Sequence, residues 1–164
     1  MSDDLKLRSL SDCYSWKLVT YTNDQPYAFT GTVEELKALV PDSPCPGLYC
    51  WHCFTRGEDR PSSQYLYIGE CRDLRTRLRC YLDPGVGDSA VKIGRQLLER
   101  QQVGSQVRLY LLELSGILHY GRCSFTHQDF ADYTKRLQIE TILIRQYRTA
   151  DFDVANNATL FIPC

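Results

Sequence analysis

The sequence has no hydrophobic run that approaches the roughly 20 consecutive apolar residues of a membrane-spanning helix. It also lacks the apolar core of a signal peptide, because the chain begins with the mainly polar and acidic stretch MSDDLK. We therefore expect a cytoplasmic protein without a membrane partner. With 164 residues, the chain is long enough to bury the core of one domain.

An excess of one charge is also missing, since 19 lysines and arginines against 20 aspartates and glutamates give a net charge of −1. This balance disfavours a protein that coats nucleic acid through its overall charge. The basic residues are nevertheless concentrated, and Asp83 and Asp88 are the only acidic residues across 74–98. The basic stretch indicates a local phosphate-binding face or, alternatively, an ordinary solvated helix face. Its residues are Arg72, Arg75, Arg77, Arg79, Lys92, Arg95 and Arg100.

The cysteines lack the spacing of a complete zinc site. Cys50 and Cys53 form a C-x-x-C pair around His52, but no second C-x-x-C or H-x-x-x-H pair supplies further ligands. Without a signal sequence we expect reduced thiols, most of them small core residues. Whether the pair binds a metal stays open at this point. The eight cysteines are Cys13, Cys45, Cys50, Cys53, Cys71, Cys80, Cys123 and Cys164.

Helical and strand-like patterns alternate along the chain, with no internal repeat and no second module. They predict an α+β fold, a small mixed or antiparallel sheet flanked by helices, in a single domain over residues 1–164. Thr32 and Glu35 match a capping box, and Asp73 and Asp88 stand where helix caps are expected. The predicted strands span 16–21, 47–54, 65–69, 107–114 and 159–162, with 107–114 apolar enough to lie within the sheet. The predicted helices span 32–40, 74–82, 88–102 and 129–147, and the main loops span 55–64 and 119–128.

The predicted helix over 129–147 carries a carboxylate in an apolar setting. Its apolar residues recur at helical spacing and mark a core-facing stripe, and Glu140 lies near the middle of that stripe. A carboxylate there is costly unless an arginine, a metal ion or a cleft accommodates it. Glu140 is therefore either a structural residue in a buried pair or a functional residue facing a cleft. The stripe consists of Phe130, Tyr133, Leu137, Ile144 and Tyr147.

The predicted helix over 74–82 places one arginine differently from its neighbours. Arg77 and Tyr81 lie four residues apart along one border of the leucine stripe, whereas Arg75 and Arg79 point further toward solvent. Arg77 is therefore the arginine best placed to reach into a cleft, although a surface arginine with a buried stem has the same spacing. The stripe consists of Leu74, Leu78 and Leu82.

Several ordered segments resemble the signature of the GIY-YIG nuclease superfamily. They are GLY at 47–49, YIG at 67–69, DLRTRLRCY at 73–81 and the glutamate-containing helix at 137–147. The stretch YIGECRDLRTRLRCYL is especially similar to the incision domain of bacterial nucleotide-excision-repair nucleases. The pair Asn156-Asn157 resembles the asparagine that closes the motif. The resemblance covers residues 45–158 and implies a GIY-YIG core preceded by a strand–helix extension over 1–44.

The resemblance implies a divalent-metal-dependent endonuclease that hydrolyses DNA phosphodiester bonds. Glu140 then holds Mg²⁺, or Mn²⁺, and Arg77 binds the scissile phosphate. Tyr49 helps to deprotonate the attacking water, which requires a lowered pKa, and Tyr67 is its hydrogen-bonding partner. Tyr81 stands where homing-type relatives have histidine and repair-type relatives have tyrosine. The implied structural residues of the motif are Gly47, Gly69 and Asn157, with Asn156 as the alternative to Asn157.

The partner implied by the resemblance is double-stranded DNA, and compact restriction-type members usually act as symmetric homodimers. The long loop 55–64 and the region 83–128 are the candidate readers of a recognition sequence. We therefore expect a site-specific restriction-type endonuclease. A structure-specific repair or recombination nuclease and a catalytically silent binding module stay open as alternatives. The predicted DNA contacts are Arg72, Arg75, Arg79, Lys92 and Arg95.

Overall fold

The structure of the chain is a computed structural model that describes residues 14–29, 32–42, 44–58, 60–82 and 88–156. These residues form an α+β fold, as the sequence predicts. A five-stranded mixed sheet has the order β1-β4-β2-β3-β7, in which only the β3–β7 pair is parallel. Within the described part of the chain, no helix combines the length and apolar character needed to cross a bilayer. The strands are β1 (Tyr14–Leu18), β2 (Gly47–Phe54), β3 (Tyr65–Cys71), β4 (Gln106–Leu114) and β7 (Asp153–Val154).

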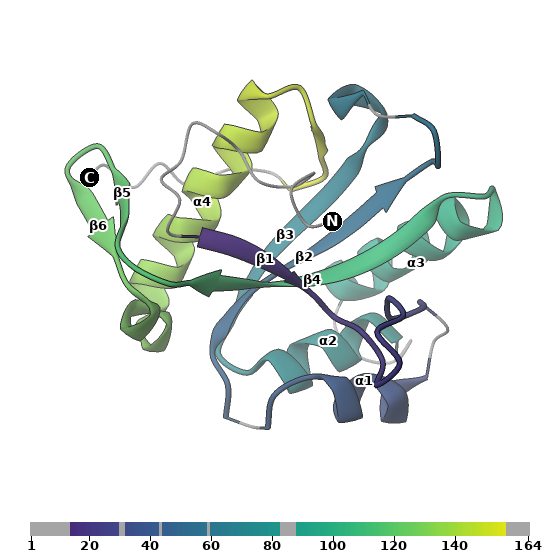
Figure 1. Cartoon of the computed structure of the whole chain (residues 1–164), viewed down its shortest axis with the longest axis horizontal. Helices are drawn as coiled ribbons and strands as arrows, with labels where there is room; N and C mark the ends of the chain where they lie inside the picture. Colours follow the sequence, from purple (N-terminus) through teal and green to yellow (C-terminus); the bar gives the residue numbers. More distant parts are fainter. Residues whose placement is uncertain (1–13, 30–31, 43, 59, 83–87, 157–164) are drawn as a thin grey trace.

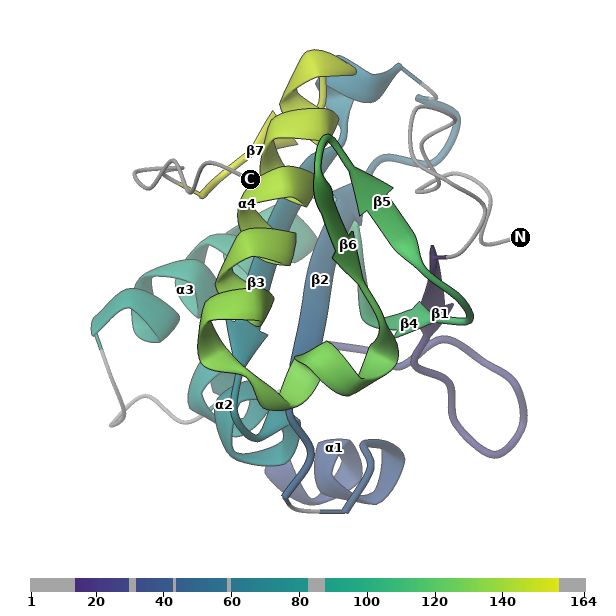
Figure 2. The same ribbon diagram turned by 90° about the vertical axis from the view of Figure 1, so that its left-hand side faces the viewer.

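Helices cover both faces of this sheet. The helix α4 (Tyr133–Thr149) lies across β2 and β3 on one face, and three helices cover the other face (Figures 1 and 2). Because side chains alternate along a strand, Leu48 and Cys50 of β2 point to the α4 side, whereas Tyr49 and Trp51 point to the opposite side. This two-sided cover explains why β2 is apolar at consecutive positions. The three helices are α1 (Val33–Leu39), α2 (Leu74–Leu82) and α3 (Asp88–Gln102).

Most predicted elements are confirmed. The bounds of β2, α2 and α3 agree with the prediction, and β4 lies inside the sheet between β1 and β2. The strand β3 continues two residues past Gly69 to Cys71. The first strand ends at Leu18 rather than at Tyr21, because the chain then turns and leaves only an isolated bridge between Thr20 and Pro26.

The region between β4 and α4 differs from the prediction of a loop over 119–128. A hairpin of β5 (Leu118–Tyr120) and β6 (Cys123–Phe125) turns at Gly121, which adopts a left-handed φ of 59°. The hairpin forms because Leu118 and Phe125 are fully buried in the core under α4. The predicted strand over 159–162 lies outside the described residues.

The start of the last helix also differs from the prediction. Thr126 and Asp129 form a capping box for a short 3₁₀ helix, and Asp132 then accepts a hydrogen bond from the Lys135 amide at the start of α4. Two caps in succession divide the predicted helix over 129–147, so that α4 begins only at Tyr133.

The buried faces of two helices are shifted from the predicted stripes. Tyr133 is 60% exposed and Leu137 is half-buried, although both lie within α4, so the buried face of the helix is rotated away from the predicted stripe. In α2, Tyr81 is buried with Leu74 and Leu78, whereas Leu82 is half-buried. The buried residues of α4 are Arg136, Ile139, Thr141, Ile142, Leu143, Ile144 and Tyr147, and Glu140 lies within their arc.

The cysteines settle the question of the C-x-x-C pair. Cys50 and Cys53 are three residues apart in a strand, so their thiols belong to the cores on opposite faces of the sheet. One metal ion therefore cannot bind both thiols. Cys123 is disulfide-bonded, so the prediction of reduced thiols does not hold there. The free thiols among the described residues are Cys45, Cys50, Cys53, Cys71 and Cys80.

Candidate active site

The first tyrosine of the site packs against a glycine on the neighbouring strand. Tyr49 of β2 lies directly opposite Gly69 of β3 in the antiparallel pair. A Cβ atom at position 69 would overlap the phenol ring of Tyr49, so only glycine lets this ring lie over the strand. At Gly47 the space is less tight, since a Cβ would lie 3.1 Å from Leu74 Cδ1. The two motif glycines thus allow β2 to approach β3 and α2.

Tyr49 reaches from the sheet to two side chains of α2. It is fully buried, and its hydroxyl forms a hydrogen bond with the hydroxyl of Tyr81. It also accepts a hydrogen bond from Arg77 Nε at 3.1 Å. The Tyr81 ring meets the rings of Tyr49 and Tyr67 edge-on, at centroid distances of 5.8 and 6.0 Å. The structure therefore brings together four of the predicted catalytic residues.

Electrostatics in this cluster oppose one predicted role. Burial and the neighbouring Tyr67 raise the pKa of Tyr49, and this effect outweighs the lowering by Arg77 and Tyr81. A tyrosine that deprotonates water needs the opposite shift. Burial alone would lower the pKa of Arg77, but Tyr49 and Tyr81 raise it above its ordinary value, so the guanidinium stays charged. In the ligand-free chain, Tyr49 is thus a fixed partner of Arg77.

Glu140 approaches the other side of β3 from α4. Its Oε1 accepts a hydrogen bond from the backbone N–H of Glu70 at 3.2 Å. Burial and the nearby Glu70 carboxylate raise the pKa of Glu140 to about 7, although the Glu70 N–H and Arg77 act in the opposite direction. The field of Arg77 therefore reaches Glu140, and β3 joins the two halves of the site.

The oxygen donors around Glu140 fit a hard divalent cation. Oε1 is engaged with the Glu70 amide, and no described residue donates a hydrogen bond to Oε2. Nowhere in the described ranges do three His, Cys, Asp or Glu side chains converge, which excludes a closed protein cage there. Mg²⁺ prefers oxygen ligands and commonly keeps several waters, so one carboxylate suits it.

An asparagine pairs with the outer edge of β3. Asn156 Oδ1 accepts from the Ile68 amide at 2.9 Å, and Asn156 Nδ2 donates to the Ile68 carbonyl at 2.5 Å. Asn156, the alternative to Asn157 in the predicted motif, therefore binds both backbone groups of Ile68, and Asn157 lies outside the described residues. At Ile68, the Asn156 side chain thus makes the backbone hydrogen bonds that a neighbouring strand would otherwise make.

The predicted DNA contacts separate into two groups. Arg75 binds within the chain, where its Nη2 lies 2.6 Å from Asp42 Oδ1 and 3.1 Å from the Val40 carbonyl. It therefore ties the end of α1 to α2, and its side chain, predicted to point toward solvent, is partly exposed and paired with Asp42. The exposed members of the set are Arg72, Arg79, Lys92 and Arg95.

Sequence reasoning missed two charged residues beside Glu140. Arg136 is 3% exposed and forms an ion pair of 2.8 Å with Glu70. Their isolated positions in the sequence resemble those of ordinary surface charges. The available signal was spacing, since Arg136 precedes Glu140 by four residues and shares its helix face.

Comparisons with family models, curated proteins and solved structures find no match for this chain. The function of the chain is therefore inferred from its motif residues and from the geometry of the site.

Proposed function

We propose that the chain is a divalent-cation-dependent endonuclease of the GIY-YIG type that hydrolyses double-stranded DNA. The observation that carries this proposal is the placement of Arg77 and Glu140 at β3. Arg77 is held by the Tyr49 hydroxyl at 3.1 Å, and Glu140 by the Glu70 amide at 3.2 Å. A fixed guanidinium whose charge acts on a carboxylate across β3 is suited to a phosphate group that gains charge during hydrolysis.

Arg77 binds the scissile phosphate in this proposal and stabilises the charge of its transition state. Tyr49 accepts a hydrogen bond from Nε and so fixes the direction of the guanidinium. Tyr81 supports Tyr49 through its hydroxyl and packs 5.5 Å below the Arg77 guanidinium. Glu140 holds the cation, which supplies Lewis-acid stabilisation of the leaving oxygen when it is bound.

The attacking water is positioned by Tyr67, which is more exposed than Tyr49 or Tyr81. Tyr49 could accept a proton from this water only if a bound cation lowered its pKa from the raised value of the free protein, because the phosphates of DNA act in the opposite direction. The more direct contribution of Tyr49 is to orient Arg77. Phenylalanine at position 49 removes both contributions at once, so cleavage falls sharply in either case.

The direct test is cleavage of plasmid DNA with Mg²⁺ or Mn²⁺. We expect Glu140→Gln, Arg77→Gln and Tyr49→Phe each to lower the cleavage rate by about 10²-fold or more, the magnitude typical of groups that stabilise transition-state charge. Glu34→Gln and Arg122→Gln, which neutralise exposed residues away from the proposed DNA-binding face, are matched controls and should cleave normally. Near-normal cleavage by Glu140→Gln contradicts the proposal.

We further propose site-specific restriction by a symmetric homodimer. The candidate readers of sequence are the β2–β3 loop over 55–64 and the part of the region 83–128 that forms α3. Discrete fragments from phage DNA support restriction, whereas cutting confined to flaps or junctions supports repair or recombination. No cleavage of duplex, nicked or branched DNA with either cation indicates a silent binding module.

A further inference from the structure

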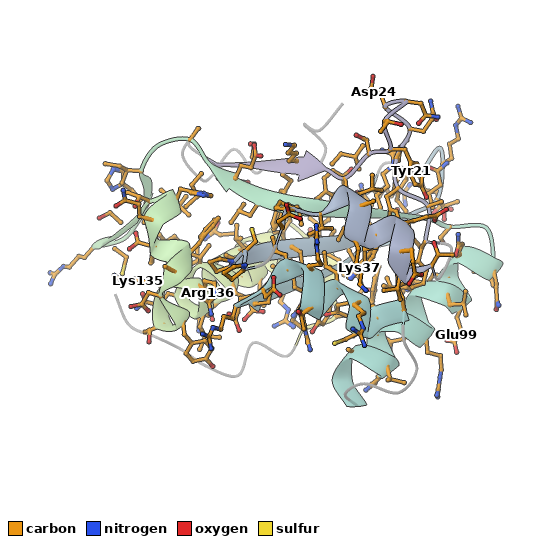
Figure 3. The ribbon with its side chains drawn as sticks, turned by 90° about the horizontal axis from the view of Figure 1, so that it is seen from below. Tyr21, Asp24, Lys37, Glu99, Lys135 and Arg136 are labelled. Atoms are coloured by element: carbon orange, nitrogen blue, oxygen red, sulfur yellow. The ribbon has the colours of Figure 1, made fainter. Side chains whose placement is uncertain are left out.

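An ion pair lies beside Glu140, between two side chains that have no role in the proposed function so far. Arg136 Nε donates to Glu70 Oε2 at 2.8 Å, and its Nη1 donates to the Phe130 carbonyl at 2.7 Å. The Arg136 side chain is 4% exposed and that of Glu70 is 18% exposed, so the pair is largely shielded from water. In Figure 3, Arg136 lies on the side of α4 that faces the sheet, whereas Lys135 lies on the outer side.

Glu70 faces Glu140 through two different groups. Its backbone N–H donates to Glu140 Oε1 at 3.2 Å, which attracts the Glu140 carboxylate. Its own carboxylate repels the carboxylate of Glu140. Arg136 lies one helical turn before Glu140 on α4 and neutralises the Glu70 carboxylate, so it offsets this repulsion. Without Arg136, two unpaired carboxylates would face a bound cation.

We infer that Arg136 is a positioning residue that neutralises Glu70 and thereby leaves Glu140 as the one free carboxylate of a divalent-cation site. This inference rests on the proposed function. A site with one negative charge binds Mg²⁺ loosely and leaves its remaining positions to water and phosphate oxygens. Arg136 thus sets the affinity and the hydration of the cation without touching it.

A purely structural ion pair makes a different prediction. Breaking it lowers stability, because a largely buried charge loses its partner, but it leaves cation affinity in the folded protein unchanged. Our inference instead predicts effects of opposite sign from the two partners. Arg136→Met unmasks a second carboxylate and strengthens cation binding. Glu70→Gln leaves an unpaired guanidinium that repels the cation, and the double variant restores the original charge.

The test is to measure Mn²⁺ binding to the full chain without DNA by isothermal titration calorimetry. We expect the dissociation constant to fall about tenfold or more in Arg136→Met and to rise about tenfold or more in Glu70→Gln, given unit charges a few ångströms from the ion. The double variant should lie within about twofold of the wild type. Lys17→Met, which breaks the exposed pair with Glu113 on β1 and β4, is the matched control and should bind as the wild type does.

If Arg136→Met does not fold, the fall in affinity of Glu70→Gln and its recovery in the double variant still decide the question. Affinities within about twofold of the wild type in all folded variants overturn the inference and make the pair structural. A wild type that binds Mn²⁺ and cleaves DNA, with variants that bind equally well, overturns this inference alone. A wild type that neither binds Mn²⁺ nor cleaves DNA overturns the proposed function as well.

Discussion

At the scale of residues, the cluster around Tyr49 shows how packing decides what a side chain can do. Its hydroxyl is engaged by Arg77 and Tyr81, and its ring lies over Gly69. Burial stabilises the neutral phenol, so proton transfer is unfavourable in the free protein. Arg77 keeps its charge and gains a defined direction from the same contacts. The cluster is therefore organised around the arginine.

Replacement of Gly69 by alanine tests this packing. The added Cβ overlaps the Tyr49 ring, so either the ring or β3 has to shift. We expect urea unfolding to show a loss of about 1–3 kcal/mol, as for other overpacked cores. Cleavage should fall further than stability alone explains, because Tyr49 no longer holds Arg77. Ser62→Ala, in the exposed part of the β2–β3 loop, should change stability by less than about 0.5 kcal/mol.

The raised pKa of Glu140 predicts a pH-dependent effect of Glu140→Gln. The folded protein favours the protonated carboxyl, so the stability from this group is full below pH 4.5 and is lost as the pH rises through about 7. Glutamine mimics the protonated form at every pH. In the presence of EDTA, the variant should therefore gain stability relative to the wild type between pH 4.5 and about 8.

Chemical unfolding at several pH values measures this difference. Glu99→Gln, which alters an exposed glutamate of α3, should show no such trend. A difference between wild type and Glu140→Gln that does not change with pH would contradict the assigned shift. Excess Mn²⁺ should reverse the trend for the wild type only, because the cation favours the ionised carboxylate.

At the scale of elements, two residues of the predicted motif, Asn156 and Glu140, bind the backbone on the same side of β3. Beyond the short β7, the hydrogen-bonding groups on this side of β3 are satisfied at three alternate residues by different groups. The Leu66 carbonyl accepts from the Ala155 amide, Ile68 pairs with the Asn156 side chain, and the Glu70 amide donates to Glu140. The asparagine and glutamate of the motif therefore close the same strand edge, which protects it from pairing with another chain.

Replacement of Asn156 by alanine tests the role of this edge. Two backbone groups of Ile68 lose their partner, and we expect a loss of about 1–3 kcal/mol if they stay buried. Hydrogen exchange followed by NMR should show faster exchange of the Ile68 amide than of amides inside the sheet. Asn23→Ala, which removes a hydrogen bond in an exposed turn, is the matched control. Equal protection of the Ile68 amide in wild type and variant excludes this role of Asn156.

At the scale of the whole molecule, the balance of charge conceals a local asymmetry. The net charge is −1, yet Arg72, Arg79, Lys92 and Arg95 are exposed on or beside α2 and α3. These helices cover the face of the sheet to which Tyr49 points, and α2 itself carries Arg77. DNA bound to this face would meet the basic residues next to the proposed phosphate site.

Single charge removals test this binding face. We expect Arg95→Gln to weaken DNA binding for all sequences and to reduce the salt slope by about 1, as one lost phosphate contact does. Arg122→Gln, in the exposed turn between β5 and β6, removes the same charge on the α4 side and should leave the slope unchanged. Fluorescence anisotropy over a range of salt concentrations measures both. Equal slopes in the two variants contradict the assignment of this face.

The local patterns predicted most elements because the responsible interactions are close in sequence. The apolar run of β2 and the helix-start signals at Asp73 and Asp88 act within a few residues. The β5–β6 hairpin could not be predicted in this way. Its short strands are stabilised by the burial of Leu118 and Phe125 under a helix that follows later in the chain.

The sequence by itself determined the α+β class, the strands that bring Tyr49 opposite Gly69, and the helix that carries Glu140. Only the tertiary structure decided that Tyr49 is buried and bound by Arg77, that Arg75 binds Asp42, and that Arg136 neutralises Glu70. The physical reason is distance along the chain. Periodicity and capping depend on neighbouring residues, whereas burial and charge pairing at this site join β2, β3, α2 and α4, whose sequences say little about which charges meet.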